Sequence, residues 1–376
     1  MKKCIVIPDS FKGTMTSIEV CSIMASEIEK YFPDCSIVNI PVADGGEGTV
    51  DCFLRAMPGK IINTVVQDAY GGDITGFYGR FYDTAVIEMA AVAGMVSNCR
   101  LDTVNASTYG VGQLIRHAID HGATRILIGL GGSCTSDAGC GMAAALGMKF
   151  YDDEGEEFIP VGKTLNRVTG MDNRQMAASL RDIEISCICD TNKVMYGPDG
   201  AAYVYGPQKG ATEDEVRLLD DNLRYFAQLI EEELGIDVSQ LPGGGAAGAM
   251  GAGAFAFFGA ELKPGIEYIM DIVGFEDNLE SADCVFTGEG SFDSQSLSGK
   301  AVSGIAARAS KYGVPVIVIA GRNRNGTRDM RKEGIAAVYE TATSEDFEMI
   351  KKTCRDDLRS TMDKVLEYIN RTVFSE

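Results

Sequence analysis

The sequence predicts an α/β fold: both chain ends form one doubly wound domain, and the middle forms a second, inserted α/β domain. Three observations support this. The chain has 376 residues, more than one hydrophobic core usually serves. Apolar runs alternate with helix-periodic segments at both ends, whereas the middle begins with paired strands. The expected boundaries assign residues 1–70 and 270–376 to the first domain and residues 71–269 to the second.

The first part of the chain predicts a strand, a helix and a strand. Residues 4–7 are a continuous apolar run, typical of a strand covered on both faces. Thr16 and Glu19 have capping-box spacing, and apolar residues then recur at helical period as far as Tyr31. A second strand at residues 37–42 leads into the sequence DGGEGT.

In the middle, residues 71–90 predict paired strands with glycine turns. A later helix begins with a capping box at Thr212 and Glu215 and ends at Gly235. Residues 241–260 carry no charge, but glycine and alanine dominate them. We therefore expect a buried, closely packed segment there rather than a transmembrane helix.

The last part of the chain repeats the alternation of strands and helices. Strands are expected at residues 284–286, 314–320 and 336–339. A helix is expected between the first two of these strands, at residues 305–309. The final helix has apolar residues from Phe347 to Ile369 on one face, which predicts that this face packs on the sheet.

Composition limits the classes of function. The formal net charge is −20, which argues against broad contact with nucleic acid or an anionic membrane. Such a protein must create local positive potential to bind an anionic ligand. The 11 cysteines include no CxxC pair, and the apolar run near the N-terminus is too short for a signal peptide. We therefore expect free thiols and a cytoplasmic location.

Residues that can carry chemistry gather where apolar runs end. Just past the carboxyl ends of predicted strands stand Asp9, Asp44, Gly131, Asp190 and Glu289. Ligands of open α/β sheets bind at that edge. The sequence therefore predicts the functional site among these loops.

The DGGEGT segment combines a carboxylate with two glycines. Asp44 and Glu47 have the spacing of a helix cap, so their role could be purely structural. Gly45 and Gly46 would also let a ligand or metal approach the backbone, so we favour a functional role for Asp44.

The segment GLGGSCTSD predicts an anion cradle at Gly131, Gly132 and Ser133. A strand runs into it, and a glycine- and alanine-rich helix follows, so N–H groups and the helix dipole would attract an anion. The alternative is that the glycines only permit tight packing. No P-loop motif is present. A second glycine segment, at residues 242–253, either lines a nucleotide near Gly248 or serves packing alone.

Polar side chains follow two further strands. Asp190 suits a base or a metal ligand, although it could instead begin an Asx-turn. Residues 287–300 combine Glu289 and Asp293 with hydroxyls and one lysine, and helix capping is the alternative there. Lys12, just past the first strand, could meet a carboxylate or phosphate.

Histidine catalysis is not favoured. His117 and His121 lie four residues apart on one predicted helix, with no third zinc ligand evident, so we expect them on the helix surface. A general base must then be a carboxylate. Carboxylates, glycine loops and a few lysines fit magnesium-assisted phosphoryl transfer.

Seven motifs resemble, in order and spacing, those of the two-domain bacterial glycerate kinases of the type-1 family: PDSFKGTMTSIE, IPVADGGEGTVD, AVIEMAAVAG, GLGGSCTSDAGCGMA, YGPDGAA, PGGGAAGAMGAG and GEGSFDSQSLSGKA. The resemblance implies a Rossmann-like domain formed by both chain ends and an inserted α/β domain, with the active site in the cleft between them. It also implies that ATP and Mg²⁺ are used to phosphorylate D-glycerate, usually on the 2-hydroxyl. The chain departs from the family pattern after Asp190, where the Asn-Pro pair is missing, and at Ser136 and Ser291.

With this resemblance, the motif residues receive expected roles. The catalytic residues would be Asp190, which accepts the hydroxyl proton, with Lys12 and Asp293; the metal ligands would be Asp44 and Glu289. Substrate and nucleotide would be bound by Ser10, Gly45, Gly46, Gly131, Gly132, Ser133, Gly248, Ser298 and Lys300. The oligomeric state stays open.

Three alternatives to this function stay open. The acceptor could be the 3-hydroxyl or a related small hydroxy acid. An NAD(P)-dependent dehydrogenase would need GxGxxG directly after the first strand, where the chain has PDSFKG. The third alternative is a non-catalytic sensor of a small acid.

Overall fold

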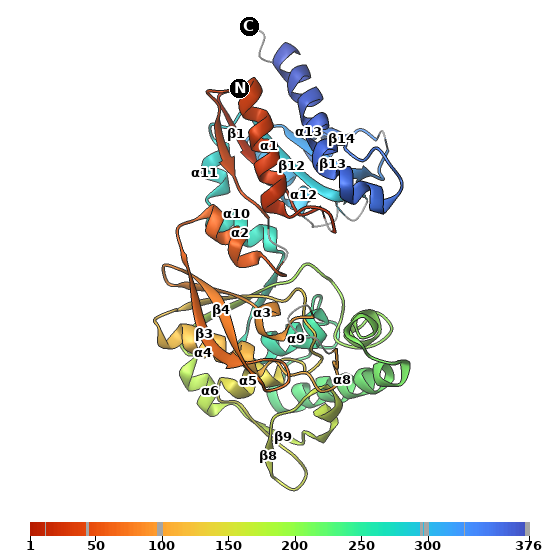
Figure 1. Cartoon of the computed structure of the whole chain (residues 1–376). Coiled ribbons are helices and arrows are strands. Elements are labelled where there is room, and N and C mark those ends of the chain that lie inside the picture. Colours follow the sequence, from red (N-terminus) through yellow and green to blue (C-terminus); the bar gives the residue numbers. More distant parts are fainter. Residues whose placement is uncertain are drawn as a thin grey trace. The chain divides into compact units, whose positions relative to one another are not determined.

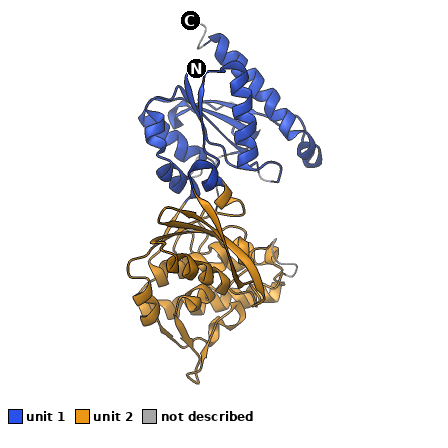
Figure 2. Ribbon diagram, turned by 60° about the vertical axis from the view of Figure 1, so that its left-hand side comes forward, with its two compact units in different colours: residues 1–43, 52–58, 264–376 blue, residues 44–51, 59–263 orange. Residues whose placement is uncertain are grey.

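The computed structural model describes residues 1–11, 13–42, 45–95, 101–293, 296, 301–326 and 328–372 (Figure 1). By its contacts the chain divides into two compact units (Figure 2). Unit 1 comprises residues 1–43, 52–58 and 264–376, and unit 2 comprises residues 44–51 and 59–263. Both chain ends therefore lie in unit 1.

Unit 1 is built on a five-stranded sheet whose strands are all parallel. Its spatial order is β2 (Ser36–Asn39), β1 (Lys3–Val6), β12 (Cys284–Phe292), β13 (Val316–Asn323) and β14 (Ile335–Glu340). Counted within the unit this is the order 2-1-3-4-5, a doubly wound arrangement in which the connections reverse between β1 and β12. The α/β fold class is confirmed.

Helices cover both faces of this sheet. On one face pack α1 (Ser17–Tyr31) and α13 (Phe347–Thr372); on the other lie α10 (Gly265–Ile272), α11 (Phe275–Leu279) and α12 (Ala301–Lys311). The predicted capping box at the start of α1 is confirmed, because the Thr16 side chain accepts the N–H of Glu19. Phe347 was expected in the core but is 50% exposed, because it is the first residue of α13 and precedes the buried stripe that begins at Cys354.

Unit 2 contains a six-stranded mixed sheet. Its order is β11 (Glu261–Lys263), β10 (Glu184–Ile188), β6 (Arg125–Gly129), β5 (Thr84–Glu88), β4 (Asp73–Phe81) and β3 (Lys60–Gln67). The first four strands are parallel, and β4 and β3 pair antiparallel. The paired strands expected at residues 71–90 are β4 and β5. Because β3 pairs with β4, residues 59–70 belong to unit 2.

The helices of unit 2 pack around this sheet, and a small sheet lies beyond them (Figure 1). Its order is β8 (Glu157–Phe158), β7 (Lys149–Tyr151) and β9 (Gly170–Asp172). In chain order the helices are α3 (Ala90–Ala93), α4 (Tyr109–Asp120), α5 (Cys140–Ala145), α6 (Arg174–Ser179), α7 (Ala201–Tyr205), α8 (Glu213–Leu234) and α9 (Ala246–Phe258), with α2 (Thr49–Ala56) at the junction of the units in sequence. The capping box at Thr212 and the αL end at Gly235 are confirmed for α8.

The uncharged segment at residues 241–260 is a buried part of unit 2, as expected. It contains all of α9, in which eleven of the thirteen residues are buried. Among the described residues, no helix has both the length and the apolar character needed to cross a membrane.

Three of the residues predicted at strand ends lie there. Asp9 follows β1 in unit 1, while Gly131 and Asp190 follow β6 and β10 in unit 2. Glu289 does not, because β12 continues past it: Glu289 pairs with Ala320 of β13, and this pairing extends the strand to Phe292. The predicted residues therefore belong to two sheet edges rather than one.

Candidate active site

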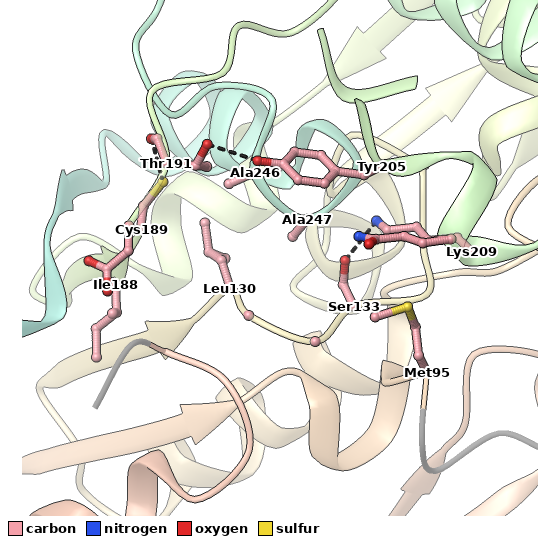
Figure 3. A pocket seen from close by; sticks show the side chains of 14 residues that line it. Met95, Leu130, Ser133, Ile188, Cys189, Thr191, Tyr205, Lys209, Ala246 and Ala247 are labelled. Carbon is pink, nitrogen blue, oxygen red and sulfur yellow. Dashed lines mark hydrogen bonds between the residues drawn. The ribbon is translucent and has the colours of Figure 1, made fainter. Parts of the chain in front are cut away.

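A cavity of about 180 Å³ opens in unit 2 where β6 and β10 end (Figure 3). Four chain segments line it, together with Met95: residues 130–133, residues 188–191, the stretch from Tyr205 to Lys209, and the start of α9. From the predicted list, the structure brings Asp190 together here with Gly131, Gly132 and Ser133. This is the ligand edge of a parallel sheet.

The two glycine segments pack backbone against backbone. The Gly131 N–H donates to the Gly45 carbonyl at 2.9 Å. A Cβ on Gly131 would lie 2.6 Å from the Cα of Gly46, so no larger residue fits without a shift of the main chain. Tight packing therefore accounts for these glycines, and the amide of Gly131 is already used.

Part of the predicted anion cradle remains. Within the part of the chain that the structure describes, the N–H groups of Gly132 and Ser133 have no recorded acceptor. We define the cradle loop as residues 131–133. Its two remaining amides can bind an anion.

The expected contribution of the following helix is wrong. α5 has only six residues and begins at Cys140, well beyond the cradle loop. Its first amides already have a partner, because the fully buried carboxylate of Asp137 accepts the N–H groups of Gly139 and Gly141 at 3.1 and 3.2 Å. Asp137 also accepts the N–H and hydroxyl of Thr108 at 2.7 and 2.8 Å. Burial raises the pKa of Asp137, and these hydrogen bonds oppose the shift.

A second buried carboxylate, that of Glu88, holds the DGGEGT segment. It accepts the N–H groups of Gly48 and Val50 at 3.2 and 2.6 Å, near the start of α2. Burial raises its pKa, and the two backbone hydrogen bonds act against this. Glu88 thus accepts hydrogen bonds from backbone N–H groups near the start of α2. The helix-cap interpretation had assigned this function to Asp44 and Glu47.

Lys209 is the functional candidate that the sequence did not reveal. Its side chain is buried, with 3% exposure, and its ammonium donates to Ser133 Oγ at 2.8 Å and to the Thr135 carbonyl at 2.7 Å (Figure 3). Burial lowers the pKa of Lys209 to about 8, although Cys134 and Asp137 act in the opposite direction and raise it. No pattern could have found it, because lysines are ordinarily exposed.

Asp190 follows the end of β10 by two residues and is an exposed residue. Thr191 beside it shares a hydrogen bond of 2.8 Å with the Tyr205 hydroxyl, and its own Oγ1 accepts the N–H of Lys193 at 3.2 Å. The side chain of Thr191 therefore supports the turn after the strand. Asp190 and Lys209 line the same cavity.

The start of α9 has an unusual backbone. Ala247, Gly248 and Ala249 all have left-handed φ values, of 55°, 67° and 66°. A Cβ on Gly248 would lie 2.0 Å from the Thr135 carbonyl, so the segment packs directly on the residues that follow the cradle loop. Alanines in this conformation are strained, a condition that clusters at functional sites. Ala246 and Ala247 line the cavity.

The remaining predicted residues belong to unit 1 or fall outside the described residues. The Ser10 N–H donates to Asp9 Oδ1 at 2.6 Å. Asp293 forms a turn with Ser296, whose N–H donates to Asp293 Oδ1 at 3.3 Å. Ser291 Oγ accepts from Arg324 Nε at 3.2 Å. Outside the described residues lie Lys12, Asp44, Ser298 and Lys300.

Among the residues that the structure describes, no group of three or more His, Cys, Asp or Glu side chains could hold a metal ion. In kinases Mg²⁺ is usually held by one or two carboxylates together with substrate phosphates, so such a cluster is not required. The carboxylates of Asp190, Glu289 and Asp293 are hard oxygen donors of the kind Mg²⁺ prefers.

A cavity lined by a carboxylate residue, a lysine and glycine loops at the ligand edge of an α/β sheet suits an enzyme that acts on small anionic ligands. The profile of the glycerate kinase family matches residues 4–370. The chain belongs to this family, which confirms the resemblance found in the motifs and the assignment as a glycerate kinase.

Individual relatives agree. A glycerate kinase of Bacillus cereus is 40% identical over 346 residues, covering 91% of each chain. A glycerate 2-kinase of Escherichia coli K12 is also 40% identical over 346 residues, again with 91% of each chain. The crystal structure of a Salmonella typhimurium LT2 protein assigned as glycerate kinase 2 matches with a TM-score of 0.84 at 36% identity and covers 98% of both chains.

Proposed function

We propose that this chain transfers the terminal phosphoryl group of ATP to the 2-hydroxyl of D-glycerate, with Mg²⁺ as the metal ion. Membership of the glycerate kinase family supports the substrate class. The name glycerate 2-kinase of the Escherichia coli relative supports the 2-hydroxyl as the acceptor. ATP is the phosphoryl donor that a kinase of this class requires.

The observation that carries the proposal is the cavity of unit 2. Asp190, Lys209 and the cradle loop all line it, and among the described residues the amides of Gly132 and Ser133 have no recorded acceptor. Phosphoryl transfer needs little covalent chemistry from the protein and depends on positioning and on neutralising charge. These groups supply both functions.

In the proposed reaction Asp190 orients the glycerate hydroxyl and accepts its proton as the new oxygen–phosphorus bond forms. The phosphates of ATP lie against the amides of Gly132 and Ser133. The apolar side chains of Leu130, Ile188 and Ala247 limit the water near the phosphoryl group, where it would compete with the hydroxyl.

Candidates to hold Mg²⁺ are Asp44, Glu289 and Asp293. When bound, the ion neutralises charge on the phosphate oxygens. Lys12, Ser10, Ser298 and Lys300 stay candidates for substrate binding, and Gly45, Gly46 and Gly248 act through the packing described above.

Phosphorus NMR tests the proposal directly. We would incubate the protein with ATP, MgCl₂ and D-glycerate and record a proton-coupled spectrum of the product. A phosphate on carbon 2 couples to one carbon-bound proton and gives a doublet, whereas a phosphate on carbon 3 couples to two and gives a triplet. A doublet is expected. A triplet would overturn the 2-hydroxyl assignment, and unchanged ATP would overturn the reaction.

A further inference from the structure

We infer that Lys209 is the anion-binding cation of this cavity: its ammonium contacts the oxygen atoms of a phosphate or carboxylate group seated against the cradle loop. The inference rests on the proposed function, because both proposed substrates are anions. It adds a residue that the motifs did not indicate.

The buried carboxylate of Asp137 favours the charged form of Lys209 but forms no ion pair with it among the described residues, and burial outweighs this effect on the pKa of Lys209. The two recorded partners of the ammonium are a hydroxyl and a carbonyl, both neutral. The ammonium has three N–H donors, and in the described part of the chain the third has no recorded partner and no carboxylate forms an ion pair with it. A buried, unpaired ammonium is unfavourable, and replacing it by an apolar side chain would often be neutral or stabilising. The two hydrogen bonds to neutral acceptors therefore explain the position of the ammonium but not its charge.

The position of Lys209 explains it better. Its ammonium is bonded to Ser133, whose own N–H has no recorded acceptor among the described residues (Figure 3). Lys209, Gly132 and Ser133 all line the same cavity, which brings this lysine and the cradle loop to one space. An ammonium beside main-chain N–H groups suits the oxygen atoms of a phosphate or carboxylate group.

The net charge of the whole chain favours such a residue. The net charge of −20 repels anionic ligands at long range. Among the residues lining the cavity, all of which the structure describes, Lys209 carries the only cationic side chain, and Asp190 adds a negative charge. A buried ammonium is also less screened by salt than an exposed one.

The test compares three forms of the full-length protein: wild type, Lys209→Met and the control Lys193→Met. Lys193 makes an ion pair with Asp199 at 3.0 Å near the same strand end but does not line the cavity. Calorimetry measures the affinity of each form for D-glycerate, Mg·ATP and inorganic phosphate separately. We expect Lys209→Met to weaken binding at least tenfold for one of the two substrates, while Lys193→Met stays within twofold of wild type.

The affected probe identifies the anion. A loss for Mg·ATP and inorganic phosphate assigns a phosphate group, and a loss for D-glycerate alone assigns the carboxylate. Affinities of Lys209→Met within twofold of wild type for all three probes would overturn the inference, as would a wild type that binds none of them. A melting temperature no lower than that of wild type is expected for Lys209→Met.

If Lys209→Met does not fold, Lys209→Gln is the second variant, because it keeps a hydrogen-bond donor and removes the charge. Wild-type affinities in Lys209→Gln would likewise overturn the inference. The turnover of wild type with D-glycerate is measured in parallel. Wild-type turnover with normal binding by the variants would refute only the role of Lys209, whereas absent turnover with Lys209-dependent anion binding would refute only the proposed reaction.

Discussion

The charge on Lys209 makes anion binding depend on pH. Burial lowers the pKa of this lysine from 10.5 to about 8, and the neighbouring Cys134 keeps its proton there because burial raises the pKa of its thiol to about 11. Below pH 8 the ammonium is charged and binds the anion. Above pH 8 the free protein loses this charge, so the affinity should fall by up to about tenfold per pH unit.

The measurement is the dissociation constant of the substrate identified by Lys209→Met, recorded in wild type from pH 7 to 9.5. The variant should give a flat profile over that range. A wild-type profile that stays flat through pH 9.5 would contradict the role of the ammonium charge.

The same shift acts on stability with the opposite sign. Between about pH 8 and 10.5 the unfolded chain binds a proton at Lys209 that the folded chain lacks, so this residue makes the free energy of unfolding rise with pH across the window. Below pH 8 its contribution is constant and unfavourable. Urea titrations at pH 8 and 9.5 measure this. The free energy of unfolding of wild type, relative to that of Lys209→Met, should be higher at pH 9.5 than at pH 8.

Asp190 is the second residue whose chemistry can be isolated. Asn has nearly the same shape but cannot accept the hydroxyl proton, so Asp190→Asn should lower kcat by about 10²-fold or more and leave the fold intact. The matched control is Asp199→Asn, because Asp199 is exposed and pairs only with Lys193 among the described residues. A kcat for Asp190→Asn near that of wild type would remove Asp190 from the mechanism.

At the scale of elements, the close approach of the two glycine segments makes a sharp prediction. A methyl group at position 131 would meet the main chain of Gly46 at 2.6 Å, so Gly131→Ala should destabilise the protein by about 1–3 kcal/mol. In the control Gly170→Ala the new methyl meets nothing within 4 Å. Urea unfolding measures both, and equal stability of the two variants would contradict the packing argument.

An element could be predicted from the sequence where the interactions that form it join residues close together along the chain. The capping boxes at Thr16 and Thr212 involve residues three positions apart, and the sequence located both helix starts. Glu289 was placed past a strand end because its strand is extended by pairing with β13, which the local sequence does not show. The partners of Asp137 and Lys209 lie far along the chain, so neither role was predictable.

The same distinction applies to the site as a whole. The strand-end rule found Asp190 and the cradle loop, because strand ends follow from apolar runs. It could not show that the helix after the cradle loop starts late, or that a buried carboxylate occupies its first amides. Motif order supplied the family, and the comparisons confirmed it.

On the scale of the whole molecule, the chain ends meet in one sheet. β1 is paired on one side with β2 and on the other with β12, nearly 280 residues away in sequence, so it connects the two ends of the chain within unit 1. If unit 1 is an independent cooperative unit, as we propose, damage to β1 should unfold it without unfolding the sheet of unit 2.

A matched pair of substitutions tests this. Val6 in β1 is completely buried, so Val6→Asp places an unpaired charge in the core of unit 1 and should destabilise it by about 3–5 kcal/mol. Val65 in β3 is 69% exposed, so Val65→Asp should change stability by less than about 1 kcal/mol. Hydrogen exchange read by mass spectrometry would then show Val6→Asp losing protection in β2, β12 and β13 while β6 and β10 keep theirs. Equal loss of protection in β6 and β10 would show that both units unfold together, and the division into independent units would be wrong.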